Sequence, residues 1–201
     1  ITAGFSGADL ENLLNEAAIL ATRAGRKAIS MIDMTEGMNK IVMGPSKKSR
    51  LVTEPDKRLT AYHESGHAVL AESLKHCDAV QEVTIIPRGQ AGGYTLTRPE
   101  NDNTQITKAK LMDTIAMSLG GRVAEELVNK NISSGASSDI KYVTQIAHRM
   151  VTEWGMSEKL GPLFYGSEGE IFVGKNYQTQ HSYSEEMAGI IDEEKRKIVD
   201  E

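Results

Sequence analysis

The chain has 201 residues, of which 28 are acidic and 23 are basic, and its formal net charge is −5. The basic residues form no block, so we expect no binding to nucleic acid. A single cysteine, Cys77, excludes an intrachain disulfide and favours a reducing compartment. No run of 18 apolar residues is present, so no membrane-spanning helix is predicted and this chain by itself is expected to be soluble.

The first part of the sequence predicts a helical hairpin. Ser6 followed by Asp9 is typical of a capped helix start, and leucines and alanines at helical spacing follow it. A second capping signal, Asp33 followed by Glu36, predicts another helix, which Gly44-Pro45 ends. Two short helices bury too little apolar surface to form a domain, so the hairpin is expected to belong to a larger unit.

Residues 44–50 are polar, basic and rich in turn residues, as in a linker between domains. We therefore predict one domain over residues 1–46 and a second over residues 47–201. The sequence begins with isoleucine rather than methionine and stops at Asp200-Glu201 inside a helical pattern. This favours a piece of a longer protein, with any membrane-spanning segments outside it.

The second domain opens with a helix that carries an H-E-x-x-H pattern. Thr53 is its expected N-cap, and the apolar spacing continues to about Lys75. His63 and His67 are four residues apart, so both imidazoles lie on one face of the helix, with Glu64 beside them. This arrangement is typical of a zinc hydrolase, in which two histidines bind the metal and the glutamate is the general base. The structural alternative is two partly exposed histidines and a solvated glutamate.

Two short strands and three helices are predicted after the motif. Residues 80–87 and 93–97 are β-branched or aromatic, and the edge of such a sheet either holds an extended peptide or merely caps the helices. Residues 107–128 are helical, and Gly120-Gly121 within them favours a close helix crossing. Further helices are expected from Asp139 and from about Ser184, with irregular or strand-like pieces at 163–165 and 171–173 between them.

A third metal ligand does not follow from local spacing. The H-E-x-x-H-x-x-G-x-x-H extension is absent, since Ser73 stands where its last histidine would be. Asp139 lies where a loop meets a helix and could reach a neighbouring helix, but an acid at a helix start is also favoured by the helix dipole. Mid-helix glutamates are routinely solvated. The open candidates are Asp139, Glu125, Glu126, His76 and His148.

Several longer segments resemble the FtsH family of ATP-dependent, membrane-anchored zinc proteases, and they occur in the expected order. These segments are residues 60–68, 83–89, 120–126, 134–140 and 154–163. Gly4–Leu10 resembles the end of that family's AAA+ module, its small helical lid. One departure is Ser65, which stands where alanine is usual and differs from it by one oxygen.

The resemblance implies a mainly α (α+β) fold, in which a remnant of the AAA+ lid precedes a mostly helical protease domain with a small sheet. It implies one Zn²⁺ per chain with His63, His67 and Asp139 as ligands, Glu64 as catalytic base, and a sheet edge that receives the substrate main chain. The resemblance further implies a homohexamer in the cell membrane, with this domain on the cytoplasmic side, that degrades misfolded or short-lived membrane and soluble proteins. ATP would bind outside this sequence, which lacks G-x-x-x-x-G-K-[ST]. The alternative function is a non-catalytic assembly or peptide-holding scaffold with a structural metal or none.

Overall fold

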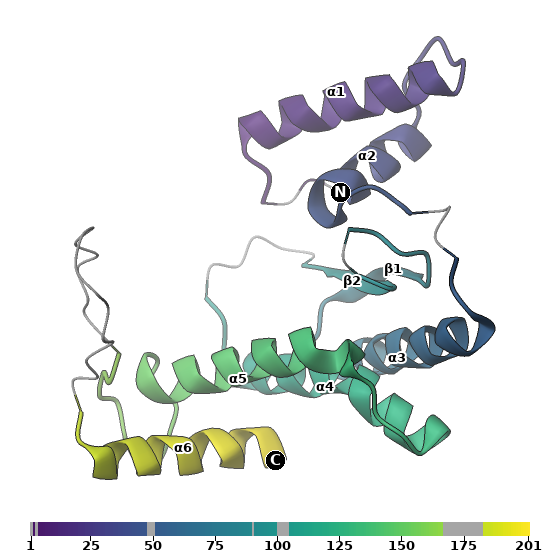
Figure 1. Ribbon diagram of the computed structural model, residues 1–201. Coiled ribbons are helices and arrows are strands. Elements are labelled where there is room, and N and C mark those ends of the chain that lie inside the picture. The colour runs from purple at the N-terminus through teal and green to yellow at the C-terminus, as the bar shows by residue number, and fades with distance from the viewer. Residues whose placement is uncertain (1, 3, 48–50, 90, 100–104, 167–182) are drawn as a thin grey trace, which may run out of the picture.

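The computed structural model describes residue 2 and residues 4–47, 51–89, 91–99, 105–166 and 183–201. Within them the fold is mainly α with one small antiparallel sheet, as the sequence predicted (Figure 1). The predicted strand-like piece at 171–173 lies outside the described residues, and 163–165 form no strand. The elements are α1 (Gly7–Arg23), α2 (Met31–Met43), α3 (Glu54–Ser73), β1 (Ala79–Thr84), β2 (Tyr94–Arg98), α4 (Lys108–Asn129), the 3₁₀ turn η1 (Ser134–Ala136), α5 (Ser137–Thr152) and α6 (Glu185–Asp200).

Helices α1 and α2 form the predicted hairpin, which lies at one end of the molecule (Figure 1). Ser6 caps α1 as expected, because its hydroxyl accepts from the backbone of Asp9 and the Asp9 carboxylate accepts from the Ser6 backbone N–H. The predicted cap of α2 was wrong by one turn. Ser30 is the N-cap and Asp33 is the third residue of the helix, where its carboxylate also pairs with Arg26. The hydrogen bonds from Arg26 and Ser30 lower the pKa of Asp33 to about 2.

Helices α3 and α4 cross in direct backbone contact. A Cβ added at Gly66 would lie 2.2 Å from the carbonyl oxygen of Gly120, and one added at Gly120 would lie 2.7 Å from the carbonyl oxygen of Gly66. No side chain fits between the two backbones at that point. The glycines therefore allow an approach that places residues of α4 against the H-E-x-x-H face of α3, as the Gly120-Gly121 pair predicted.

The sheet lies between the hairpin and the layer formed by α3 and α4 (Figure 1). Strand β1 pairs with β2 so that Thr84 lies opposite Tyr94 and Val83 opposite Thr95. β1 ends at Thr84, three residues earlier than predicted. Beyond it the carbonyl of Pro87 accepts from the backbone N–H of Lys47, so this segment pairs with the chain that follows α2 instead of extending β1.

The main apolar core lies between α4, α5 and α6 and fixes α5, the helix on which Asp139 lies. The core consists of Leu111, Ile115, Val143, Ile146, Ala147, Met150, Val151, Leu160, Ile191 and Ile198.

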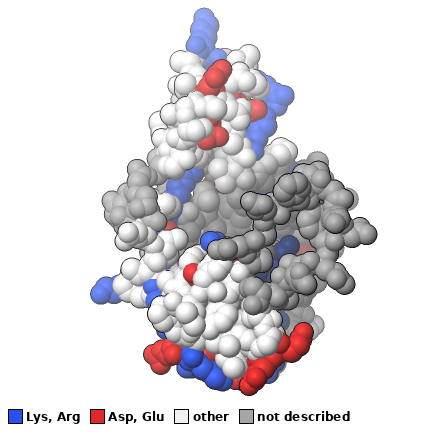
Figure 2. Space-filling view, turned by 90° about the vertical axis from the view of Figure 1, so that its left-hand side faces the viewer, with Lys and Arg blue, Asp and Glu red and all other residues white. Residues whose placement is uncertain are grey.

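The space-filling view shows charged side chains gathered mainly at the upper and lower ends of one face, with a few more, mostly Lys and Arg, between them (Figure 2). None of the described helices is long and apolar enough to cross a membrane.

The helix crossing gives a first testable prediction. Gly66→Ala forces a methyl group against the backbone of Gly120, so we expect the free energy of unfolding to fall by about 3 kcal/mol in urea titrations. Gly189→Ala is the matched control, because Gly189 lies within α6 and a Cβ there meets nothing within 4 Å. It should raise the stability by about 0.5–1 kcal/mol. Equal effects of the two substitutions would contradict the close crossing.

Candidate metal centre

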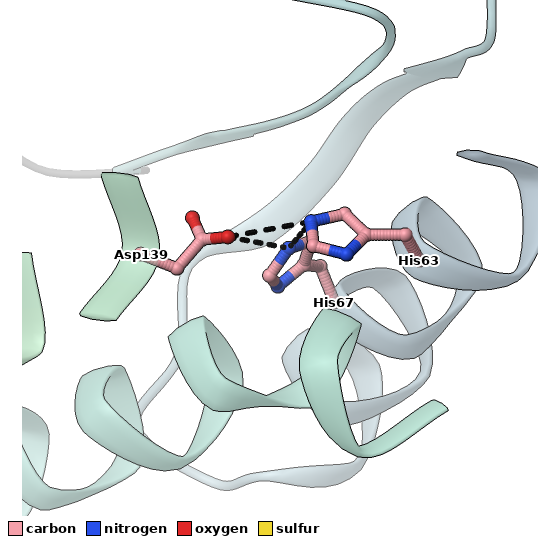
Figure 3. Close-up of side chains that lie close together, drawn as sticks. All are labelled: His63, His67 and Asp139. Atoms are coloured by element: carbon pink, nitrogen blue, oxygen red, sulfur yellow. Dashed lines mark hydrogen bonds and ion pairs between the residues drawn. The ribbon is translucent and has the colours of Figure 1, made fainter. Parts of the chain in front are cut away.

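Two histidines of α3 and one aspartate of α5 point toward one another (Figure 3). His63 and His67 lie one turn apart on α3, and their Nε2 atoms are 3.1 Å apart. Asp139 is the third residue of α5, and its Oδ2 lies 3.3 Å from His63 Nε2 and 3.8 Å from His67 Nε2. The structure thus brings together three of the residues that sequence analysis singled out.

The spacing of these three atoms suits a tetrahedral metal ion. Zinc binds histidine nitrogen and carboxylate oxygen at about 2.0–2.2 Å, so neighbouring ligand atoms of a tetrahedral site lie about 3.3–3.6 Å apart. The distances of 3.1, 3.3 and 3.8 Å need only small side-chain rotations to match. In the part of the chain that the structure describes, this is the one group of three or more candidate ligands close enough to share an ion.

The other nitrogen of each imidazole is already engaged. His63 Nδ1 lies 2.8 Å from Glu125 Oε1, and His67 Nδ1 lies 2.8 Å from the carbonyl oxygen of Met117. Since a carboxylate and a carbonyl only accept, we assign the ring proton of each histidine to Nδ1. The lone pairs of both Nε2 atoms then face the Asp139 carboxylate, and such an electron-rich cluster favours a bound cation.

The structure gives Glu125 a position that the sequence did not predict. The sequence was compatible with a third metal ligand or a solvated glutamate, but Glu125 is only 1% exposed and faces Nδ1 of His63, the nitrogen that points away from Asp139. It also accepts from the backbone N–H of Ser133 at 2.8 Å and from the Ser133 hydroxyl at 3.1 Å. Glu125 therefore holds both His63 and the loop before α5. Its spacing of four residues from Gly121, on the face toward α3, was the signal available in the sequence.

The remaining candidate ligands lie elsewhere. Glu126 and His76 are exposed, and the backbone N–H of His76 donates to the Asp113 carboxylate. His148 is nine residues beyond Asp139, about 13 Å farther along α5 at 1.5 Å per residue. Gly121 instead makes room for the cluster, because a Cβ there would lie 2.5 Å from His67 Nε2.

Glu64 is 6% exposed and is held by strand β2. The Thr95 hydroxyl lies 3.0 Å from Glu64 Oε2 and 2.9 Å from the Glu64 carbonyl oxygen. Burial raises the pKa of Glu64, although the Thr95 hydrogen bond and the two histidines oppose the rise. Burial lowers the pKa of His63, but a protonated His63 ring would also donate from Nε2 to Asp139 and would be stabilised by the charge of Glu64, so the net pKa is raised.

A cleft of about 660 Å³ opens above these residues. Such a volume accommodates several residues of an extended peptide. The cleft is lined by α3, by β2 with the loop before it, by α4 and by the start of α5, and the last residue of α2, Met43, also reaches it. A carboxylate therefore lies beside the cation-binding group at an accessible surface, which is the arrangement required for metal-assisted hydrolysis.

Comparison with known proteins agrees with this geometry. Residues 50–201 match the model of peptidase family M41, and residues 1–36 match the AAA+ lid domain. The chain belongs to peptidase family M41. His63, Glu64, His67 and Asp139 all lie within the part that matches the M41 model.

The similar curated proteins are also peptidases by name. A protein of Thermoanaerobacter sp. named ATP-dependent zinc metalloprotease FtsH 1 is 52% identical over the whole chain, which covers 33% of that relative. FtsH 3 of Symbiobacterium thermophilum is 53% identical over 98% of the chain and 32% of the relative. FtsH of Veillonella parvula is 52% identical over the whole chain and 31% of the relative. The chain spans about a third of the length of these relatives.

The different places of Asp139 and Glu125 give the second prediction. Asp139→Ala removes a converging atom, so we expect divalent-metal affinity to fall further than in Glu125→Gln. Glu125→Gln keeps all three converging atoms and should cost about 10–100-fold, because only the orientation of His63 is weakened. Zinc titrations followed by calorimetry and cobalt titrations followed by absorption spectroscopy measure the metal affinity of each variant. Exposed Glu126→Gln is the control and should leave the affinity unchanged. A larger loss in Glu125→Gln would assign the ligand to Glu125.

Proposed function

We propose that this chain is the zinc-dependent endopeptidase part of an ATP-dependent, membrane-anchored protease. The observation that carries the proposal is the juxtaposition of Glu64 with the group formed by His63, His67 and Asp139, at the floor of a peptide-sized cleft. Membership of peptidase family M41 and the names of the relatives support it. His63, His67 and Asp139 are the proposed metal ligands, and Glu64 is the proposed catalytic base.

The proposed reaction is hydrolysis of a peptide bond. When bound, one zinc ion supplies a Lewis acid that activates water and polarises the scissile carbonyl. Glu64 accepts a proton from the attacking water and returns it to the leaving amine. Its burial favours this role, because a raised pKa makes the carboxylate a stronger base. Thr95 keeps the Glu64 carboxylate oriented beside the cleft.

The substrate main chain is proposed to bind along β2. In the described residues β2 pairs on one side only, with β1, and Gly93, Tyr94 and Thr95 line the cleft. An extended peptide added to the free edge of a strand is held by backbone hydrogen bonds, which do not depend on its sequence. This mode of binding suits an enzyme that acts on unfolded polypeptides.

The wider assembly is proposed from the relatives, because this chain covers only a third of their length. Residues 1–46 are the proposed end of an AAA+ helical lid and residues 47–201 the proposed protease domain, supported by the family matches at 1–36 and 50–201. The proposed protein is a homohexamer in the cell membrane, with this domain on the cytoplasmic side. In the proposed assembly, ATP-driven delivery brings misfolded or short-lived membrane and soluble proteins to this domain for degradation. A non-catalytic scaffold is less well supported, since it gives Glu64 no chemical task.

The third prediction tests the proposed base. Glu64→Gln keeps the size of the side chain but cannot accept the water proton, so kcat for an unstructured polypeptide should fall by about 10²–10⁴-fold in the full-length protein. The zinc content should stay near one per chain, because Glu64 is not among the converging ligand atoms. The two measurements are steady-state cleavage and elemental analysis of the same preparation. Cleavage that persists in Glu64→Gln would overturn the proposed function.

A fourth prediction concerns Thr95. Thr95→Val keeps the shape of the side chain but removes the hydroxyl that lies 3.0 Å from Glu64 Oε2, so kcat should fall by about five- to tenfold with zinc content unchanged. Thr95→Ser restores a hydroxyl and should recover most of that loss. If the valine and serine variants are equally impaired, Thr95 acts through packing on β2 rather than through Glu64.

A further inference from the structure

Arg88 is a buried cation that the proposed chemistry does not use. It follows β1 and is only 6% exposed. Its Nη2 lies 2.6 Å from Glu36 Oε2 of α2, and its Nη1 lies 3.5 Å from the carbonyl oxygen of Gly44, just after α2. Arginine is rarely buried without partners, and both of these partners belong to the hairpin side of the molecule. Arg88 therefore connects α2 with the sheet beside the cleft.

Further polar contacts join α2 and the segment after it to the same part of the sheet. Asn39 of α2 is buried, and its Nδ2 donates to Glu82 Oε2 of β1 at 2.6 Å. The backbone N–H of Lys47 donates to the carbonyl oxygen of Pro87 at 2.7 Å. Side-chain and main-chain bonds thus fix the position of the end of α2 relative to β1.

This attachment of α2 determines the position of Met43. Met43 is the last residue of α2, and it lines the cleft that contains His63 and Glu64. Its backbone touches the chain next to Arg88, because a Cβ added at Gly89 would lie 2.8 Å from the Met43 carbonyl oxygen. Met43 is therefore the hairpin's contribution to the lining of the cleft, and it stays in place only while α2 is attached.

We propose that Met43 is a substrate-contacting residue of the cleft and that Arg88 is the positioning residue that holds it there. The inference rests on the proposed peptidase function. Methionine is apolar and adaptable, so the surface that it presents suits an apolar side chain of an extended peptide. The hairpin then contributes directly to which peptides bind, in addition to the residues of α3 and β2.

The first test is a kinetic comparison on the full-length, zinc-loaded protein with a fluorogenic peptide rich in apolar side chains. Met43→Ala and Arg88→Gln should each raise KM by about three- to tenfold and leave kcat within about twofold, because the residues that perform the chemistry are untouched. In the double variant KM should rise by less than the product of the two single effects, because both substitutions act on Met43; Arg88→Gln also removes the contact of Arg88 with the Tyr94 ring. Lys110→Gln is the control, since it breaks an ion pair of the same 2.6 Å length with Asp78 away from this cleft, and it should leave KM unchanged.

Exchange of the two charges adds a rescue experiment. Arg88→Glu combined with Glu36→Arg should bring KM back toward the unmodified value, whereas each single charge reversal raises it. A general loss of stability would instead lower the active fraction, and so the apparent kcat, at unchanged KM. An unchanged KM in Met43→Ala, or a loss confined to kcat, would overturn the proposal.

A second readout does not depend on activity. Spin labels at Glu11→Cys on α1 and Glu186→Cys on α6, in a Cys77→Ser background, report the distance between the hairpin and the rest of the molecule. Arg88→Gln should broaden this distance distribution, and the control Lys110→Gln should not. A distribution unchanged by Arg88→Gln would overturn the attachment even in an active enzyme. A protein that cleaves no peptide in any form would contradict the proposed function, while the distance measurement would still decide the role of Arg88.

Discussion

The contact between Gly66 and Gly120 is the constraint on which the candidate centre depends. It brings the backbones of α3 and α4 so close that neither position tolerates a Cβ. On the same face of α4, the Met117 carbonyl and the Glu125 carboxylate then meet the Nδ1 atoms of His67 and His63. A more distant crossing would leave both imidazoles free to rotate. The orientation of the proposed ligands His63 and His67 therefore depends on glycine at positions 66 and 120.

The third converging residue and the carboxylate beside the centre are fixed by other parts of the fold. The apolar core between α4, α5 and α6 holds α5, so that Asp139 in its first turn faces the histidines. Strand β2 holds Glu64 through the Thr95 hydroxyl. Three structural units thus converge on one cleft: a helix crossing, an apolar core and a small sheet. Each contributes one component of the proposed hydrolytic site, and the hairpin contributes Met43 to its wall.

Local sequence patterns predicted the elements well but could not place residues that depend on tertiary contacts. The Thr53 cap, the motif helix and the glycine pair were confirmed because capping and close packing leave local signals. Asp139 was only one of five candidates until the family resemblance singled it out, since its approach to His63 spans 76 positions and depends on the core. The burial of Glu125 was missed because its spacing of four residues from Gly121 points to burial only once α3 is known to cross α4 at the glycines. The roles of the ligands and of Glu64 remain predictions.

The most direct test of the central claim is an anomalous-scattering map of crystals of the zinc-loaded protein, recorded on both sides of the zinc absorption edge. The account predicts one peak per chain, about 2.0–2.2 Å from His63 Nε2, His67 Nε2 and an Asp139 carboxylate oxygen. Glu64 should lie next to the peak without bonding to it, and Glu125 should remain on His63 Nδ1. A peak bonded to Glu125 in place of Asp139, or no peak between the two histidines, would contradict the account.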